Sequence, residues 1–348
     1  MFHFPGKVCL SPMRYSLKPI FPGLIVLAVI VFPSDRVGGQ ELPWTEGSTT
    51  IAVLPDTQYY TTKYPDNFQA QARWIAENRE KRNIAYVWHL GDITQDDAPA
   101  QWEVAKSCFN MIEGDVPYLL VPGNHDYSGS AARSSQLGEY FPVDKMKQWP
   151  TFGGVFHENK LDNNYHLFRI GDQDWIALGL ECGPRQAVVE WANRVLEQHA
   201  DRFAAVVTHA YLFRDNQRYD YTKGSQRASP HGFAGDGNDG EELWQKLIRK
   251  HGNVMIVISG HVRTGGPTGS YLASEGDHGN VVHQMMTCYQ KLPRGGLGYM
   301  RTLEFLPDGK TVQVRTFSPS KKTRRTSGLE EFTFKLQGPT RDESFQLR

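Results

Sequence analysis

The sequence predicts an α/β fold, a four-layer αββα sandwich in which two facing mixed β-sheets lie between outer helices. Three observations predict it. Short apolar runs alternate with segments of helical periodicity, the apolar runs end in polar residues, and the last third of the chain contains strand patterns without helices. Strand, helix and strand in alternation favour parallel pairing through crossover helices. A chain of 348 residues is long enough to bury the core of such a fold.

Five apolar runs are predicted to be buried strands, and each leads into polar residues. The runs are residues 50–54, 84–90, 118–121, 204–207 and 254–258. Ligands of open α/β sheets lie outside the carboxyl ends of the strands. We therefore expect the polar residues that follow these strands to gather in one place. They are Asp56, Asp92, Asn124, His209 and His261.

The segments between and after these runs complete the predicted sandwich. Helical periodicity marks residues 67–82, 99–113, 185–199 and 241–251, and strand patterns mark residues 164–170, 175–180, 281–286, 299–306, 311–317 and 331–336. These additional strands are expected to form a second sheet that faces the first. Nothing in the composition divides the chain, so we expect one domain over residues 50–336 and a tail at 337–348.

The first 39 residues have the pattern of a signal peptide. Basic residues precede an apolar run at 20–32, and small residues follow it before Gln40. The pattern predicts a secreted or periplasmic protein. An uncleaved anchor is the alternative, although the run is shorter than the roughly 20 residues of a membrane span. Translation could begin at Met1 or at Met13.

Charge and cysteine content exclude some classes of function. The 38 basic and 38 acidic side chains balance, so no overall field favours a nucleic acid or an acidic membrane. Without the leader three cysteines remain, Cys108, Cys182 and Cys288. Their spacing matches neither a zinc knuckle nor a redox pair, and we expect buried free thiols without a disulfide framework.

The polar strand ends occur in five ordered blocks. These are Asp56-Thr57-Gln58, Gly91-Asp92, Gly123-Asn124-His125-Asp126, Thr208-His209 and Ser259-Gly260-His261. Each block alone would suit a turn. In this order they resemble the calcineurin-like metallophosphoesterases, whose blocks are D-x-H, GD, GNH(D/E), a lone His and GH-x-H. The segments 54–58 and 298–301 also resemble an exported bacterial subgroup with D-T-Q in place of D-x-H.

The resemblance implies a metallo-dependent phosphatase-like fold with one or two divalent transition metal ions, Mn, Zn or Fe. It implies that Asp92 bridges two metals, that Asn124, His209 and His261 complete the second site, and that Asp56 and Gln58 belong to the first. The implied reaction is hydrolysis of a phosphomonoester or phosphodiester by in-line attack of metal-bound hydroxide.

Two neighbouring residues have implied roles in proton transfer. His125 is implied to protonate the leaving group, and Asp126 is implied to orient it. The alternative is that His125 caps a turn after its strand. His89 lies within an apolar run and is expected to be a core histidine with satisfied hydrogen bonds.

Two departures from the family pattern fall on the first metal. Gln58 replaces the histidine of D-x-H, and Arg263 replaces the last histidine of GH-x-H. An amide oxygen binds a hard cation weakly, and a guanidinium cannot be a ligand. We expect a weaker first metal, selective for hard ions such as Mg or Mn, with thiolates unused. Arg263 either grips a phosphate oxygen catalytically or points to solvent.

Two other classes of function stay open. A degenerate member of the fold could bind a phosphorylated or glycan ligand without turnover, which the altered first site favours. An exported protein could use the cleft only as an interaction surface. We expect a phosphorylated small molecule or a phosphodiester as partner, no specific nucleic acid and no stable membrane span. The sequence specifies neither the substrate nor the oligomeric state.

Overall fold

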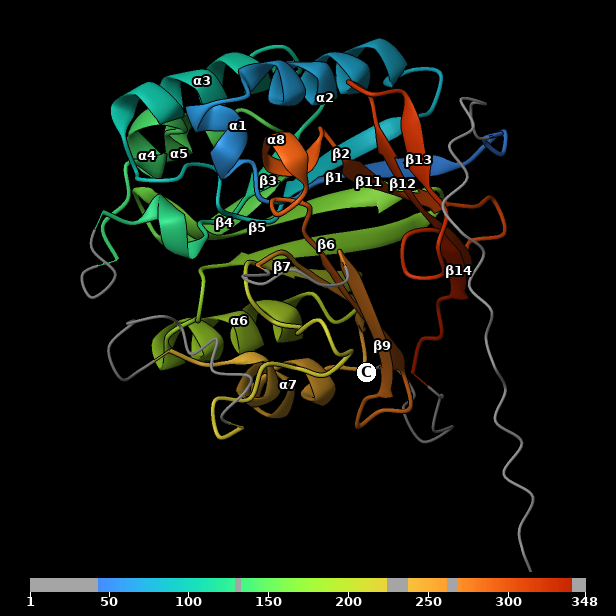
Figure 1. The fold of residues 1–348 in the computed structure, drawn as a ribbon. Helices are drawn as coiled ribbons and strands as arrows, with labels where there is room; N and C mark the ends of the chain where they lie inside the picture. Colours follow the sequence, from blue (N-terminus) through green and yellow to red (C-terminus); the bar gives the residue numbers. More distant parts are fainter. Residues whose placement is uncertain (1–42, 129–132, 224–236, 262–267, 340–348) are drawn as a thin grey trace, which may run out of the picture. The chain divides into compact units, whose positions relative to one another are not determined.

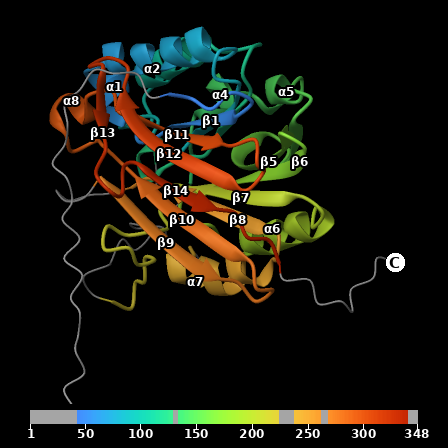
Figure 2. The ribbon, with the colours of Figure 1, turned by 90° about the vertical axis from the view of Figure 1, so that its right-hand side faces the viewer.

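Two seven-stranded sheets form the centre of the protein, and helices cover their outer faces (Figures 1 and 2). The structure is a computed structural model that describes residues 43–128, 133–223, 237–261 and 268–339. The first sheet contains β1 (Thr49–Leu54), β2 (Ile84–His89), β3 (Tyr118–Leu120), β11 (Met300–Phe305), β12 (Thr311–Ser318), β13 (Thr323–Arg325) and β14 (Phe332–Lys335). The second contains β4 (Phe152–His157), β5 (Lys160–Ile170), β6 (Gln173–Leu180), β7 (Phe203–Thr208), β8 (Val254–Ser259), β9 (Gly269–Glu275) and β10 (Val281–Thr287). The predicted four-layer α/β fold is confirmed.

The four predicted helices are present, and shorter ones accompany them. The helices are α1 (Gln58–Thr62), α2 (Pro65–Asn78), α3 (Pro99–Phe109), α4 (Leu137–Tyr140), α5 (Val143–Met146), α6 (Gln186–Gln198), α7 (Gly240–Lys246) and α8 (Pro293–Gly296). Proline at the first helical position starts α2 and α3, where its missing N–H costs no hydrogen bond. A capping box of Asp239 and Glu242 starts α7. Figure 1 shows α2 and α3 on the outer face of the first sheet, and α6 and α7 on that of the second.

Three apolar layers separate the four structural layers. Side chains alternate along each strand, so Ile51 and Val53 of β1 pack between the sheets, whereas Ala52 and Leu54 pack against the helices. A third layer lies between the second sheet and α6 and α7. Both faces of the central strands are therefore buried, which explains their continuous apolar runs.

The division of strands between the sheets differs from the sequence prediction. The strands predicted as a separate second sheet are shared: β11 pairs with β1 of the first sheet, and β10 pairs with β8 of the second. The five predicted parallel strands are also divided, because β1, β2 and β3 lie in one sheet and β7 and β8 in the other. An apolar run indicates a buried strand but not its neighbour. The polar strand ends consequently come from both sheets.

Some predictions fall on parts of the chain beyond the described ranges. The predicted signal peptide, Arg263 and residues 340–348 of the predicted tail all lie there. Within the described ranges, no helix combines the length and the apolar character needed to cross a membrane. Cys108, Cys182 and Cys288 are buried, and none of them forms a disulfide within the described part of the chain.

Candidate metal centre

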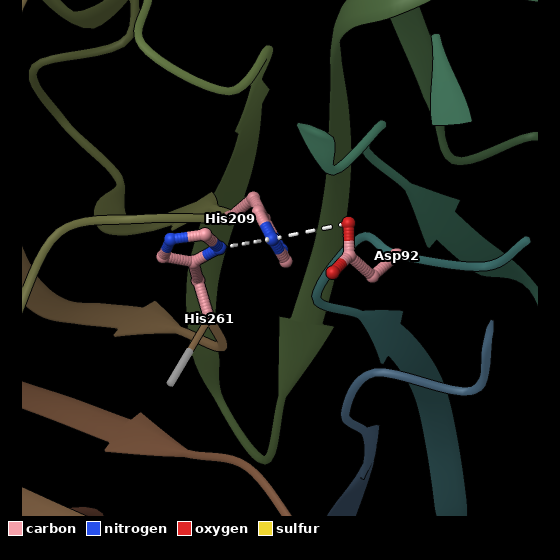
Figure 3. Close-up of side chains that lie close together, drawn as sticks. All are labelled: Asp92, His209 and His261. Carbon is pink, nitrogen blue, oxygen red and sulfur yellow. Dashed lines mark hydrogen bonds and ion pairs between the residues drawn. The ribbon is translucent and has the colours of Figure 1, made fainter. Parts of the chain in front are cut away.

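Five polar residues predicted from the strand ends lie where the two sheets present their carboxyl edges. Asp56, Asp92 and Asn124 follow β1, β2 and β3, and His209 and His261 follow β7 and β8. Three of them form a compact group: the ligand atoms of Asp92, His209 and His261 all lie within 4.8 Å of one another. Figure 3 shows His209 between the other two side chains.

The His209 cluster, defined as Asp92, Asn124, His209 and His261, directs several lone pairs at one point. The Nε2 atom of His209 is 3.2 Å from Asp92 Oδ1, 3.2 Å from Asn124 Oδ1 and 3.0 Å from His261 Nδ1. The Nδ1 atom of His209 lies 2.8 Å from the carbonyl oxygen of Leu90, to which its N–H donates. When this ring is neutral, it presents a lone pair at Nε2 toward the other acceptors.

This arrangement favours a positive charge at its centre. Burial disfavours a charged ring at His209, but the Asp92 carboxylate raises the pKa of His209 to about 9. Burial likewise disfavours ionised Asp92, but His209 holds the pKa of Asp92 well below its usual range. A proton or a divalent ion would satisfy the same electrostatic demand. Carboxylate, amide oxygen and imidazole are suitable donors for a transition metal, so the residues fit the predicted ion.

The glycines of the motif blocks are required by close contacts around these ligands. A Cβ atom at Gly123 would overlap the backbone nitrogen and the carboxylate of Asp92, and one at Gly260 would overlap the carboxylate of Asp56. The ligands Asp92 and His261 themselves have φ angles of 49° and 58°. This left-handed conformation is uncommon outside glycine and is concentrated at functional sites.

A second group, the Asp56 cluster, contains two residues that sequence reasoning missed. It consists of Asp56, Gln58, Cys288 and Gln290. The Oδ2 atom of Asp56 lies 3.0 Å from Cys288 Sγ and 3.2 Å from Gln290 Nε2. The Nε2 atom of Gln58 lies 2.6 Å from Gln290 Oε1 and 2.9 Å from Asp92 Oδ2, which joins the two clusters. Burial raises the pKa of Asp56 to about 7.

The position of β10 could have revealed the two missed residues. Cys288 and Gln290 follow β10, which is parallel to β8 and therefore ends at the same edge of the sheet. The sequence predicted a strand at residues 281–286 but gave no indication that it lies beside β8. Ligands lie outside the carboxyl ends of parallel strands, so knowledge that β10 is parallel to β8 would have identified Cys288 and Gln290.

His125 lies beside the His209 cluster, and Gln95 holds its ring. The backbone N–H of His125 donates to Asp92 Oδ1 over 3.0 Å. Its Nδ1 atom lies 2.9 Å from the main-chain oxygen of Gln95 and 2.9 Å from the Nε2 atom of Gln95. Gln95 thus offers both an acceptor and a donor to Nδ1, so the ring can keep its orientation in either tautomer.

The contacts of Asp126 differ from the prediction that it orients His125. Its wholly buried carboxylate accepts hydrogen bonds from the backbone N–H groups of Ile93, Thr94 and Gly123 and from the Thr94 hydroxyl. Within the described residues these bonds tie the loop after β2 to the loop after β3, and the contacts of the His125 ring go to Gln95 instead. The carboxylate accepts hydrogen bonds mainly from backbone donors because these two loops approach each other closely.

His89 is a satisfied core histidine, as predicted. It is fully buried, its Nε2 atom lies 3.0 Å from Thr57 Oγ1, and its Nδ1 atom accepts from the backbone N–H of Gly91. Burial lowers the pKa of His89 to about 3, so the ring is neutral. Its role is to support the loops that carry Asp56 and Asp92.

The fold and the cluster of carboxylate, amide and imidazole groups are those of an α/β protein with a candidate metal site at the carboxyl edges of two facing sheets. The calcineurin-like phosphoesterase family model matches residues 49–265, and the chain belongs to this family. Its members use divalent metals, and the His209 cluster is a potential site for one.

Two curated relatives and one solved structure are similar to this chain. The chain is 32% identical over 288 residues to the uncharacterized protein YvnB of Bacillus subtilis. The matched region covers 82% of this chain and 21% of that protein. It is 23% identical over 195 residues to an Arabidopsis thaliana protein named "Probable inactive purple acid phosphatase 27", covering 53% of this chain and 29% of that protein. This chain thus spans less than a third of either curated relative. The purple acid phosphatase PPD1 of yellow lupin (Lupinus luteus) has a similar fold, with a TM-score of 0.50, 15% identity, and coverage of 86% of this chain and 55% of that chain.

Proposed function

We propose that this protein hydrolyses a phosphoester in a metal-dependent reaction. The observation that carries the proposal is the convergence of Asp92, Asn124, His209 and His261, with the backbone of His125 anchored to Asp92. Membership of the calcineurin-like phosphoesterase family supports the reaction class. The proposed substrate is a phosphomonoester or a phosphodiester.

The chain's own residues provide two places for an ion. The His209 cluster would hold one, and Asp56 with Gln58 would hold another that shares Asp92. Bound ions would neutralise phosphate charge and make water a stronger nucleophile. Gly123 and Gly260 contribute by allowing the loops to approach the carboxylates without a side chain between them. Buried His89 contacts Thr57 in the loop after β1, and buried Asp126 accepts a hydrogen bond from Gly123 in the loop after β3.

His125 is suited to deliver a proton to the departing oxygen. Its Nδ1 atom is engaged by Gln95, which leaves Nε2 as the atom for proton transfer. Its ring is half-buried, and its backbone N–H donates to Asp92, a proposed ligand of both ions. Imidazole is the side chain best suited to general acid catalysis near neutral pH. Gln95 is a positioning residue in this proposal, and His125 is a catalytic residue.

Binding without turnover is the second candidate function. The observation that favours it is the Gln58 amide, whose Nε2 atom donates to Asp92 Oδ2 where the family pattern has an imidazole. A weak or unoccupied first site would leave substrate binding at the His209 cluster but reduce hydrolysis. Metal content and catalytic rate, measured on the same preparation, distinguish the two functions.

The test uses p-nitrophenyl phosphate and its bis ester as substrates for the purified protein. Hydrolysis should disappear after chelation and return with Mn²⁺ or Zn²⁺. His209→Ala should lose both tight metal binding and activity. His278→Ala is the matched control, because His278 is exposed in the turn before β10, at the opposite end of that strand from the site. Activity that survives exhaustive chelation would exclude the proposed reaction, and bound metal without turnover would favour the second candidate.

We also propose that the protein is exported, on the basis of the signal-peptide pattern at residues 1–39. N-terminal sequencing of the mature protein should begin at or near Gln40. Recovery of the intact N-terminus in the cytoplasm would contradict export.

A further inference from the structure

The Asp56 cluster contains a sulfur atom among oxygen donors. Cys288 is 4% exposed, and its Sγ atom lies 3.0 Å from Asp56 Oδ2. The backbone N–H of His261 also lies 3.2 Å from that carboxylate oxygen. The thiol is therefore inside the site, whereas Cys108 is buried in the apolar layer between α3 and the first sheet.

A buried oxygen of Gln58 indicates that this cluster accommodates a ligand. Gln58 is 0% exposed, and its buried Oε1 atom has no hydrogen-bond partner among the residues that the structure describes. A buried acceptor left unpaired costs about 1–3 kcal/mol, so native proteins rarely retain one without a reason. The nitrogen of the same amide touches Asp92 Oδ2 and Gln290 Oε1. Exchanging the amide oxygen and nitrogen would bring three oxygens together, an arrangement that a bound cation would stabilise.

The donors available to such a cation differ from those of the His209 cluster. They are one carboxylate oxygen from Asp56, a shared one from Asp92, amide oxygens from Gln58 and Gln290, and the sulfur of Cys288. Asp56 Oδ2 contacts Cys288 Sγ and Gln290 Nε2, and the Gln58 amide nitrogen contacts Gln290 Oε1 and Asp92 Oδ2. Thiolate is a soft ligand that favours Zn²⁺ over Mg²⁺ or Mn²⁺. The sulfur thus supplies a further donor atom in a cluster where Gln58 stands in place of the histidine of the family pattern.

We propose that Cys288 is a ligand of the ion held by the Asp56 cluster, and that it makes this position selective for a thiophilic ion such as Zn²⁺. The inference rests on the proposed function, because it assumes an ion beside Asp92. When the sulfur binds, the S–H bond is replaced by a bond to the metal and the proton passes to water. The proposed selectivity for Zn²⁺ is opposite to the preference for hard ions that oxygen donors alone would predict.

Cobalt provides a spectroscopic test that does not depend on activity. The full chain carrying Cys9→Ser is stripped of metal and titrated with Co²⁺, which occupies zinc sites and gives a near-ultraviolet sulfur-to-cobalt charge-transfer band when thiolate is bound. The band should appear in this protein, persist with Cys108→Ser added, and disappear with Cys288→Ser added. Cys288→Ser should also weaken Zn²⁺ binding at one of two sites by at least about 10-fold, and leave Mg²⁺ binding within about 2-fold.

A second measurement needs no change at Cys288 and guards against a variant that fails to fold. X-ray absorption at the zinc edge of protein loaded with two Zn²⁺ ions should show sulfur at about 2.3 Å. Two bound ions with only oxygen and nitrogen neighbours would overturn the role of Cys288 while leaving the proposed function intact. Binding of a single ion without sulfur would also overturn it. Failure to bind any ion would overturn both the role of Cys288 and the proposed function. Hydrolysis would then be independent of metal or absent.

Discussion

Replacing Asp126 separates a structural role for this carboxylate from a catalytic one. The substitution Asp126→Ala removes the acceptor for four hydrogen bonds, with donor distances of 3.0 Å from Ile93 N, 2.6 Å from Thr94 N, 2.9 Å from Thr94 Oγ1 and 2.8 Å from Gly123 N. All of these groups are buried. The bonds connect the loop that carries Asp92 to the loop that carries Asn124 and His125, so their loss should disturb both stability and the metal centre.

The magnitude follows from the donors left without partners. Each buried donor that loses its acceptor costs about 1–3 kcal/mol, which gives an upper range of roughly 4–12 kcal/mol. Relaxation and entry of water reduce such sums, and single substitutions above about 5 kcal/mol are exceptional. Burial also raises the pKa of Asp126 to about 7, so part of the bonding is to a neutral carboxyl group. We expect a loss of about 3–5 kcal/mol for Asp126→Ala and a smaller loss for Asp126→Asn, which keeps one acceptor oxygen.

The pH dependence of this effect has a defined sign. The pKa of Asp126 in the folded protein lies above its ordinary value of 3.8, so its contribution to stability is fully present below that value. The contribution is lost as the pH rises toward about 7. The difference in unfolding free energy between wild type and Asp126→Ala should therefore be larger at pH 5 than at pH 8.

Urea unfolding of metal-free protein, followed by circular dichroism, measures these differences. Asp172→Ala is the matched control, because Asp172 is exposed in the turn between β5 and β6, and we expect a change within about 0.5 kcal/mol. The structural role of Asp126 would be refuted if Asp126→Ala had an unfolding free energy within about 1 kcal/mol of that of wild type. It would also be refuted if this variant showed the leaving-group dependence expected of a residue that orients His125.

Three further predictions concern proton transfer, close packing and a buried histidine. His125→Ala should lower turnover by about 100- to 10,000-fold on alkyl esters, less on activated phenolate esters, and leave metal content unchanged; equal loss on both substrates would contradict its role as acid. Gly123→Ala should weaken metal binding by at least about 10-fold in calorimetric titration, because its Cβ would overlap Asp92, and unchanged binding would refute the packing argument. Burial lowers the pKa of His166 to about 3, so wild type should lose stability as the pH falls below about 6.5. His166→Gln should reduce that slope by up to about 1.4 kcal/mol per pH unit, and an unchanged slope in urea unfolding would show that His166 does not contribute.

The sequence alone indicated the central strands, the four longer helices and the chemistry of one cluster, whereas β4, β9, β13 and the short helices were not predicted. Continuous apolar runs identify strands buried on both faces, and this information is local because it depends on which side chains avoid water. The polar residues after β1, β2, β3, β7 and β8 could be selected without knowing the sheets, since the carboxyl ends of parallel strands share an edge. The structure brings Asp92, His209 and His261 together accordingly.

Only the tertiary structure decided which strands are neighbours and what each polar side chain touches. The placement of β11 beside β1 and of β10 beside β8 depends on pairing between segments far apart in the chain, which a local apolar pattern does not encode. Cys288 enters the site for this reason. The hydrogen bonds of Asp126 could not be predicted from the sequence either, because they depend on how closely two loops approach each other. A buried carboxylate accepts hydrogen bonds from the donors that packing places near it. A sequence pattern gives the residue types but not the distances between the carboxylate and these donors.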